Sequence, residues 1–185
     1  MGVLRQLEAS DAEALAELVQ RNRDFLAPWE PVRPETYFTL AGQRAAVADA
    51  LALQTAGRGH SWVIADETGS AAGRINLNNI VRGPFQSASV GYWLSQDAGG
   101  RGLATRAVLE VADVAFGLLG LHRLEAGTIP ENHRSQAVLL RTGFERFGYA
   151  VAYLNIAGRW RDHLLFQRVA PTPSGWPPVG HEEPQ

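Results

Sequence analysis

A short glycine-rich segment, Gly99-Gly100-Arg101-Gly102, lies between a stretch typical of a strand and a stretch typical of a helix. Residues 87–94 are rich in β-branched and aromatic side chains, a composition that favours a strand. Residues 103–118 are almost continuously apolar and contain no proline, which favours a buried helix. Glycines at such a junction let the backbone approach an anion, toward which the free N–H groups of the first helical turn point. The segment therefore predicts a strand, a phosphate-binding turn and a helix in succession.

A second strand–turn–helix unit follows. Residues 123–129 have the composition of a strand, Pro130 ends them, and a helix opens at Asn132-His133-Arg134-Ser135 and closes at Gly143-Phe144. Apolar periodicity and turn residues indicate the other elements. These are a strand over residues 2–7, a helix with a capping box at residues 10–13, a helix over residues 36–56, a hairpin of strands 60–65 and 71–77, a polar connection over residues 78–86, and a hairpin of strands 149–156 and 163–169.

The basic residues exclude several kinds of chemistry, because all 17 are arginines and the chain contains neither lysine nor cysteine. A P-loop NTPase requires a lysine in its phosphate loop, and enzymes that use a Schiff base, pyridoxal phosphate, a thiolate nucleophile or a cysteine zinc site are excluded in the same way. The net charge of −2 argues against non-specific nucleic-acid binding. We expect a cytoplasmic protein, because no uncharged apolar run is long enough to span a membrane and the N-terminus lacks the apolar core of a signal peptide.

The composition predicts one folded domain followed by a tail. Residues 1–169 are expected to form the domain, since 45% of the sequence is hydrophobic and the length suffices for one sizeable core. Residues 170–185 contain five of the ten prolines, so we expect them to lie outside that core as an extended tail.

The glycine segment and the order of the elements resemble the GNAT superfamily of acyl-CoA-dependent N-acyltransferases. The phosphate loop of that superfamily reads Gln/Arg-x-x-Gly-x-Gly/Ala. Gly102 and Ala104 stand at its last two fixed positions, whereas Gly99 departs from the pattern at the first. The resemblance covers residues 3–169. It implies an α+β fold, the GNAT fold, with a mixed and mostly antiparallel sheet of about seven strands and helices on both faces.

Three segments resemble one branch of the superfamily, the ribosomal-protein-alanine N-acetyltransferases of the RimJ/RimL type: residues 22–31, 79–85 and 153–163. This resemblance implies transfer of the acetyl group of acetyl-CoA, by direct attack, to the N-terminal α-amine of a protein such as a ribosomal protein. Nothing in it calls for a metal. From the charge and the apolar runs we expect no direct contact with nucleic acid or membrane, and we expect either a monomer or a homodimer. Two alternatives stay open: an N-acetyltransferase of a small amine or antibiotic, and a non-catalytic acyl-CoA-binding regulatory module, which Ser89 and Gly99 favour.

The resemblance also assigns an acetyl-CoA site. The backbone of Tyr92, Trp93 and Leu94 would offer hydrogen-bonding groups to the pantetheine arm. The phosphate loop would bind the pyrophosphate through Gly99, Gly100, Arg101, Gly102, Leu103, Ala104 and Thr105. Asn132 would contact the cofactor arm and Ser135 the thioester sulfur, where a hydroxyl can hydrogen-bond or protonate the departing thiolate. A purely structural role as helix N-cap is the alternative interpretation of Asn132.

The resemblance does not identify a general base. Many members of the superfamily carry a glutamate two residues before the Gly-Tyr pair of the fourth strand, where this chain has Ser89. Glu125, Asp162 and His163 are the remaining candidates. The candidates for contact with the acceptor substrate are Phe25, Trp29, Arg82, Tyr153, Trp160 and Asp162. A site without the glutamate suits an α-amine, which is far less basic than the side-chain amine of lysine.

Overall fold

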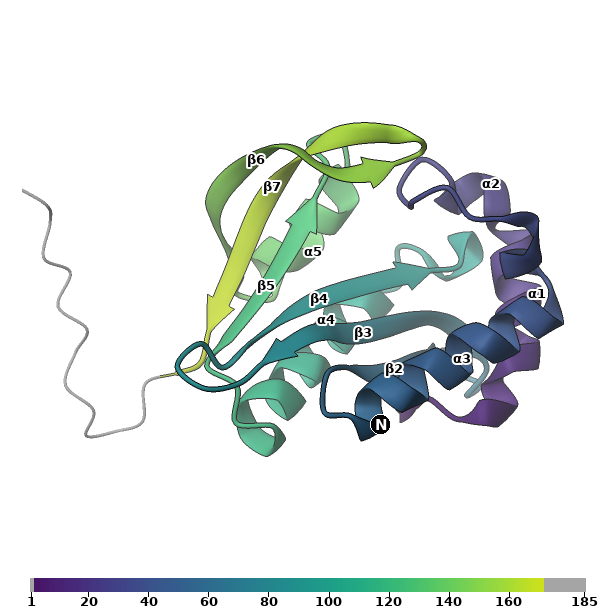
Figure 1. Ribbon diagram of the computed structural model, residues 1–185, viewed down its shortest axis with the longest axis horizontal. Coiled ribbons are helices and arrows are strands. Elements are labelled where there is room, and N and C mark those ends of the chain that lie inside the picture. Colours follow the sequence, from purple (N-terminus) through teal and green to yellow (C-terminus); the bar gives the residue numbers. More distant parts are fainter. Residues whose placement is uncertain (1, 172–185) are drawn as a thin grey trace, which may run out of the picture.

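A seven-stranded mixed sheet forms the centre of the fold (Figure 1). The computed structural model describes residues 2–171. The strands follow the order β1-β2-β3-β4-β5-β7-β6, and every neighbouring pair is antiparallel except β4 and β5. Their bounds are Leu4–Gln6, His60–Ala65, Ala71–Val81, Ser87–Leu94, Arg123–Thr128, Glu145–Ile156 and Arg159–Val169 for β1 to β7 in turn. The predicted α+β class with a mostly antiparallel sheet is confirmed.

Helices cover both faces of this sheet. In Figure 1, α3 lies in front of the sheet with α1 beside it at the right, and α4 and α5 lie behind the sheet. The helices are α1 (Ala12–Arg21), α2 (Arg23–Leu26), α3 (Leu40–Thr55), α4 (Leu103–Asp113) and α5 (His133–Arg141), with a π-helical turn, Val114–Leu118, directly after α4. No helix among residues 2–171 is long and apolar enough to cross a membrane.

Two cores correspond to the two faces, because side chains alternate along each strand. Behind the sheet, Ile75 and Leu77 of β3 are fully buried against the helical layer of α4 and α5, with Val108 and Leu139 on those helices. In front, Val63 of β2 packs with a smaller cluster formed by Leu7, which follows β1, and by residues of α1 and α3: Ala12, Leu15, Leu18, Val47 and Ala50. Each buried Leu, Ile or Val side chain contributes about 1.5–3 kcal/mol to folding.

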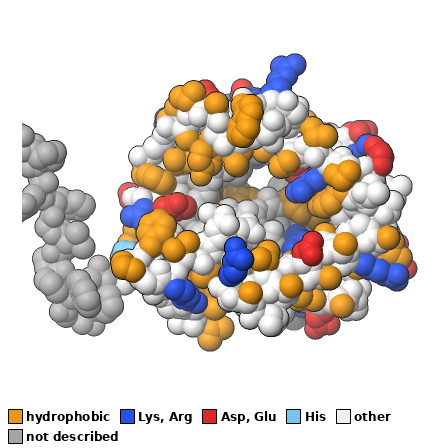
Figure 2. All heavy atoms as spheres, in the orientation of Figure 1, with side chains coloured by type: hydrophobic (Ala, Val, Ile, Leu, Met, Phe, Trp, Pro, Cys, Tyr) orange, Lys and Arg blue, Asp and Glu red, His pale blue; other side chains and the backbone are white. Residues whose placement is uncertain are grey.

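The parallel pair β4–β5 is joined only at its beginning. Ser87, Ala88 and Ser89 pair with Arg123, Leu124 and Glu125, and beyond these residues the two strands diverge (Figure 1). Among the described residues, the C-terminal half of β4 therefore has no strand partner on its β5 side, and we call the space between the parted strands, where Figure 2 shows the surface hollowed, the slot. The backbone of residues 92–94, which the resemblance assigns to the pantetheine arm, lies along it.

Several element boundaries differ from the sequence-based predictions. The capping box expected at residues 10–13 is wrong by two positions, because the Asp11 carboxylate accepts a hydrogen bond of 2.8 Å from the Glu8 N–H and ends a short 3₁₀ turn. The helix expected from residue 36 begins at Leu40, since Thr39 is extended and its hydroxyl accepts from the Gly42 N–H at 3.1 Å. Strand β3 continues through residues 78–81 of the polar connection expected over residues 78–86.

Candidate active site

The turn between β4 and α4 requires glycine at two positions. Gly100 has φ +78° and Gly102 has φ +74°, both in the left-handed region that L side chains rarely adopt. A Cβ atom at either position would meet no atom within 4 Å, so the backbone conformation and not crowding calls for glycine. Gly99, which departs from the family pattern, has an ordinary φ of −67°.

The first turn of α4 is free to bind an anion. Gly102 is its N-cap residue and offers no side chain, so the first N–H groups of the helix have no side-chain cap. Leu103 is buried and anchors the turn, Ala104 and Thr105 are half-buried, and Arg101 is exposed. Open glycine backbone and uncapped N–H groups fit a diphosphate.

A buried asparagine that the sequence analysis did not assign to the site positions this turn. Asn22, at the junction of α1 and α2, is 5% exposed. Its Oδ1 accepts from the Gln96 N–H at 2.8 Å, and its Nδ2 donates to Ser95 Oγ at 3.1 Å and to the Leu18 carbonyl at 2.9 Å. The only sequence signal was a polar residue at an apolar position of a helical pattern.

Asn22→Ala should lower the free energy of unfolding by about 2 kcal/mol and weaken acetyl-CoA binding, because the Gln96 N–H would lose its buried partner. Chemical denaturation and calorimetric titration measure the two effects. Asn155→Ala, at an exposed position on β6, is the matched control. Equal stabilities of the two variants would contradict the positioning role.

Tyr92 and Ser135 meet through their side chains. The Tyr92 hydroxyl of β4 lies 2.9 Å from Ser135 Oγ on α5 and 3.3 Å from the Ser135 carbonyl oxygen. Burial raises the pKa of Tyr92 to about 12, although the hydrogen bond with Ser135 acts in the opposite direction. The phenol is therefore neutral at physiological pH and can donate to the serine. The sequence analysis considered only the backbone of Tyr92.

Asn132 fixes the position of Ser135. Its Oδ1 accepts from the Ser135 N–H at 3.1 Å, which makes Asn132 the side-chain cap of α5. The capping interpretation is thus correct, and a contact of Asn132 with the cofactor arm stays a prediction. Of the other two β4 candidates, Trp93 packs with the front cluster and Leu94 with the rear cluster.

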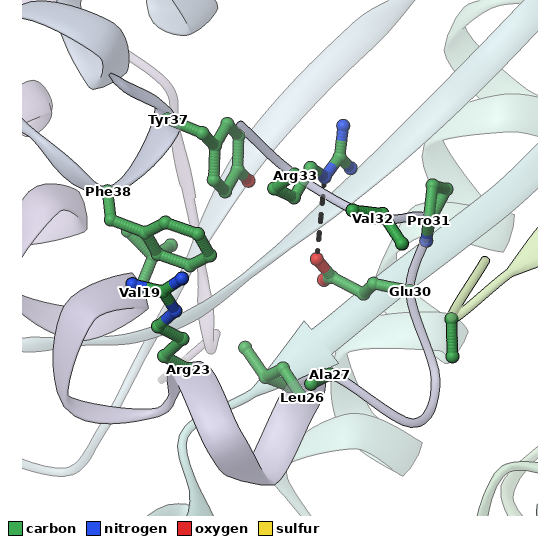
Figure 3. A pocket seen from close by; sticks show the side chains of 11 residues that line it. Val19, Arg23, Leu26, Ala27, Glu30, Pro31, Val32, Arg33, Tyr37 and Phe38 are labelled. Carbon is green, nitrogen blue, oxygen red and sulfur yellow. Dashed lines mark ion pairs between the residues drawn. The ribbon is translucent and has the colours of Figure 1, made fainter. Parts of the chain in front are cut away.

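A cavity of about 300 Å³ opens beside α2 (Figure 3). Its walls are mostly apolar, and two arginines lie over aromatic rings in it: Arg23 stacks over Phe38 at 4.5 Å, and Arg33 stacks over Tyr37 at 4.6 Å. Glu30 points toward Arg33, with an Oε2–Nε distance of 3.7 Å. Burial raises the pKa of the Glu30 carboxyl, and Arg33 opposes that shift.

Most of the predicted acceptor residues lie around this region. Phe25 and Trp29 belong to α2 and the segment after it, and Tyr153 and Trp160 lie on the β6–β7 hairpin. The two sides meet where the Ala157 N–H donates to the Glu30 carbonyl at 2.9 Å. Figure 2 shows the surface hollowed between this hairpin and the helices in front of the sheet.

Two predicted acceptor residues have structural partners. Arg82 donates to the Leu119 carbonyl at 2.6 Å, at the opposite end of β4 from this cavity, so the structure does not bring it together with the others. The Asp162 carboxylate accepts from the Tyr149 hydroxyl and, at 2.8 Å, from the Ala152 N–H. These two bonds lower the pKa of Asp162.

Strands that part beyond Ser89, an uncapped glycine turn at the end of β4 and the hydroxyl pair of Tyr92 and Ser135 fit the site of an acyl-CoA-dependent acyltransferase. Residues 3–145 match the family model described as acetyltransferase (GNAT) domain. The chain belongs to the GNAT acetyltransferase family.

The similarity to known proteins extends over nearly the whole chain. The [ribosomal protein uS5]-alanine N-acetyltransferase of Escherichia coli is 36% identical over 177 residues, which cover 95% of this chain and 90% of that protein. The crystal structure of ribosomal-protein-S5-alanine acetyltransferase from Vibrio fischeri is similar with a TM-score of 0.87 at 35% identity, over 91% of this chain and 93% of that one. Mycobacterium smegmatis RimJ in complex with CoA-disulfide has a TM-score of 0.86 at 33% identity, over 90% and 81%.

Proposed function

We propose that this acetyltransferase transfers the acetyl group of acetyl-CoA to the N-terminal α-amine of a protein, with a ribosomal protein as the substrate class and the cytoplasm as the compartment. The observation that carries the proposal is the similarity over 95% of the chain to an enzyme named for acetylating an alanine of a ribosomal protein. Alanine has no amine in its side chain, so the amine that such an enzyme acetylates is the α-amine.

The residues of the slot supply binding and leaving-group assistance. The backbone of the turn at residues 99–102 and the first turn of α4 bind the diphosphate. Acetyl-CoA supplies an activated thioester, whose carbonyl the backbone N–H groups of Tyr92 and Leu94 polarise. These two groups point away from β3, because the Ser95 N–H donates to Ala72 of β3 and the direction alternates along the strand. When the Tyr92 hydroxyl donates to Ser135 Oγ, the serine hydrogen is free to point at the thioester sulfur.

The reaction balances without a covalent enzyme intermediate. The amine nitrogen forms a bond to the acetyl carbon and loses a proton, and the bond between that carbon and sulfur breaks. The departing thiolate accepts a hydrogen bond from the Ser135 hydroxyl and then takes up a proton from solvent. Thiols of this kind have a pKa of about 8.5, so a hydrogen bond suffices to stabilise much of the developing charge.

The basicity of the acceptor supports an α-amine. At pH 7 an ε-amine with a pKa of about 10.4 is neutral in about one molecule in 2,500, whereas an α-amine with a pKa of about 7.8 is neutral in about one in seven. The site has Ser89 where a glutamate would help to deprotonate the more basic amine. An α-amine therefore needs far less help with its deprotonation from the residues of the site.

A peptide that begins with alanine or serine should be acetylated at its α-amine, as read by mass spectrometry. The same peptide with a blocked N-terminus and an internal lysine should stay unmodified, because its amine is almost fully protonated. Acetylation chiefly of the lysine, or of a small polyamine alone, would show the proposed acceptor to be wrong.

A further inference from the structure

The acceptor amine arrives protonated in most molecules, so the proposed reaction calls for a group that takes up its proton. Three of the carboxylates near the site are poorly placed for this. Asp162 is held by two hydrogen bonds that lower its pKa. Glu30 faces Arg33 in the cavity beside α2. Glu125 lies at the closed end of the slot, beside Ser89 in register and 3.8 Å from Arg123.

His163 of β7 lies at the wall of the open part of the slot. A Cβ atom at Gly127 would be 3.4 Å from His163 Cδ2, so the imidazole rests directly on the β5 backbone where glycine leaves room. Gly127 comes after the last residue of β5 that pairs with β4. Tyr153 covers the ring, with 5.4 Å between the two centroids, and only 3% of His163 is exposed.

The hydrogen bond of His163 selects one tautomer. Nδ1 lies 3.0 Å from the Arg161 carbonyl oxygen, which can only accept. In the neutral ring Nδ1 therefore carries the hydrogen, and the lone pair of Nε2 is free to accept a proton. A neutral imidazole with one ring nitrogen free can act as a general base.

The side chains of His163 and Ser135 lie on opposite faces of the sheet. Gly127 pairs with Leu165, and His163 is two residues from Leu165, so its side chain is on the same face as those of Ser89 and Trp93, toward α1 and α3. Tyr92, which holds Ser135, faces the rear core instead. A slot through the sheet with a proton donor behind and a proton acceptor in front suits attack by an amine from the front.

We propose that His163 Nε2 is the general base that accepts the proton of the acceptor amine, an inference that rests on the proposed function. The amine transfers one proton to Nε2 and forms the bond to the acetyl carbon, the carbon–sulfur bond breaks, and the imidazolium then releases its proton to solvent. The charged and titratable groups around the ring are Tyr153 of β6, Asp162 and Arg161 of β7, and Glu131, which binds Arg161 at 2.8 Å. Across β5 the ring meets Gly127, which has no side chain.

His163→Asn is the sharpest test, because the asparagine Nδ2 can still donate to the Arg161 carbonyl while Nε2 is lost. With a peptide bearing a free α-amine, kcat should fall about 100-fold at pH 7 with an unchanged KM for acetyl-CoA. The deficit should shrink at about pH 9, where the α-amine is already mostly neutral. His122→Asn, the same change at an exposed histidine, should leave kcat and its pH profile unchanged.

Other outcomes overturn the inference. An unchanged kcat, or a loss that is equal at all pH values, would assign His163 a structural role, and the pH-dependent deficit appearing in Glu125→Gln instead would assign the base to Glu125. If His163→Asn does not fold, nitrogen-15 NMR of the wild-type imidazole reads the tautomer, and a hydrogen on Nε2 contradicts the proposal. Wild-type protein that acetylates no α-amine would instead refute the proposed function.

Discussion

Gly102→Pro abolishes acetyl-CoA binding in calorimetric titration; this is the largest effect that we expect. Proline fixes φ near −65°, whereas Gly102 has φ +74° and caps α4, so the turn and the first helical N–H groups cannot keep their positions. Gly100→Glu should act similarly, because a left-handed non-glycine residue costs about 1–2 kcal/mol and a carboxylate repels the diphosphate.

The matched control for both variants is Arg101→Ala in the same turn. An exposed ion contact is worth about 1 kcal/mol or less, so the affinity should fall by less than about tenfold. Far-ultraviolet circular dichroism tests whether each variant is folded. A folded Gly102→Pro variant with normal affinity would remove this turn from the cofactor site.

Ser135→Ala should lower kcat by about 100-fold and leave the KM for acetyl-CoA nearly unchanged. A hydrogen bond to the sulfur strengthens as negative charge develops in the transition state, and interactions of that kind appear in kcat. Steady-state kinetics with an alanine-initiated peptide measure the effect. Ser70→Ala, in the turn between β2 and β3, is the control.

An unchanged kcat in Ser135→Ala would leave Ser135 with a purely structural role in the first turn of α5. Tyr92→Phe extends the test, since it removes the hydroxyl that lies 2.9 Å from Ser135 Oγ. If the tyrosine orients the serine hydrogen, this variant should also lose kcat. Calorimetric titration of the variant with acetyl-CoA tests whether the substitution has changed the packing of the slot and with it the affinity.

Local signals made the order of elements predictable from the sequence. Each of these signals depends on residues that are close together in the sequence. They are the glycines at 100 and 102, which are left-handed in the structure, the proline at 130 and the alternating apolar residues. The first residue of a helix was less predictable where more than one residue could serve as its N-cap, as at the start of α3. Thr39 is the N-cap there because its hydroxyl forms the hydrogen bond in the folded chain.

Contacts between distant segments could not be read in this way. The contact of Tyr92 with Ser135 depends on the divergence of β4 from β5, and the contact of Asn22 with Gln96 depends on how α1 packs beside the turn. Arg82 illustrates the opposite error. Its segment resembles the family, yet its guanidinium holds the Leu119 carbonyl, because resemblance locates a segment in the fold without fixing what its side chains bind.

Because β4 and β5 pair over only a few residues, we expect bound acetyl-CoA to stabilise the sheet. In the part of the chain that the structure describes, backbone pairing between the two halves of the sheet is limited to residues 86–89 and 122–125, whereas the proposed acetyl-CoA site takes the turn before α4 from one half and Ser135 from the other. A ligand gripping both halves works as a reversible cross-link, worth about 2.7 kcal/mol at a hundredfold excess over its Kd. Amide hydrogens of β4 and β5 at this junction should then exchange with deuterium more slowly as acetyl-CoA is added. The resistance of the domain to heat and to proteolysis should rise with the acetyl-CoA concentration in the same way.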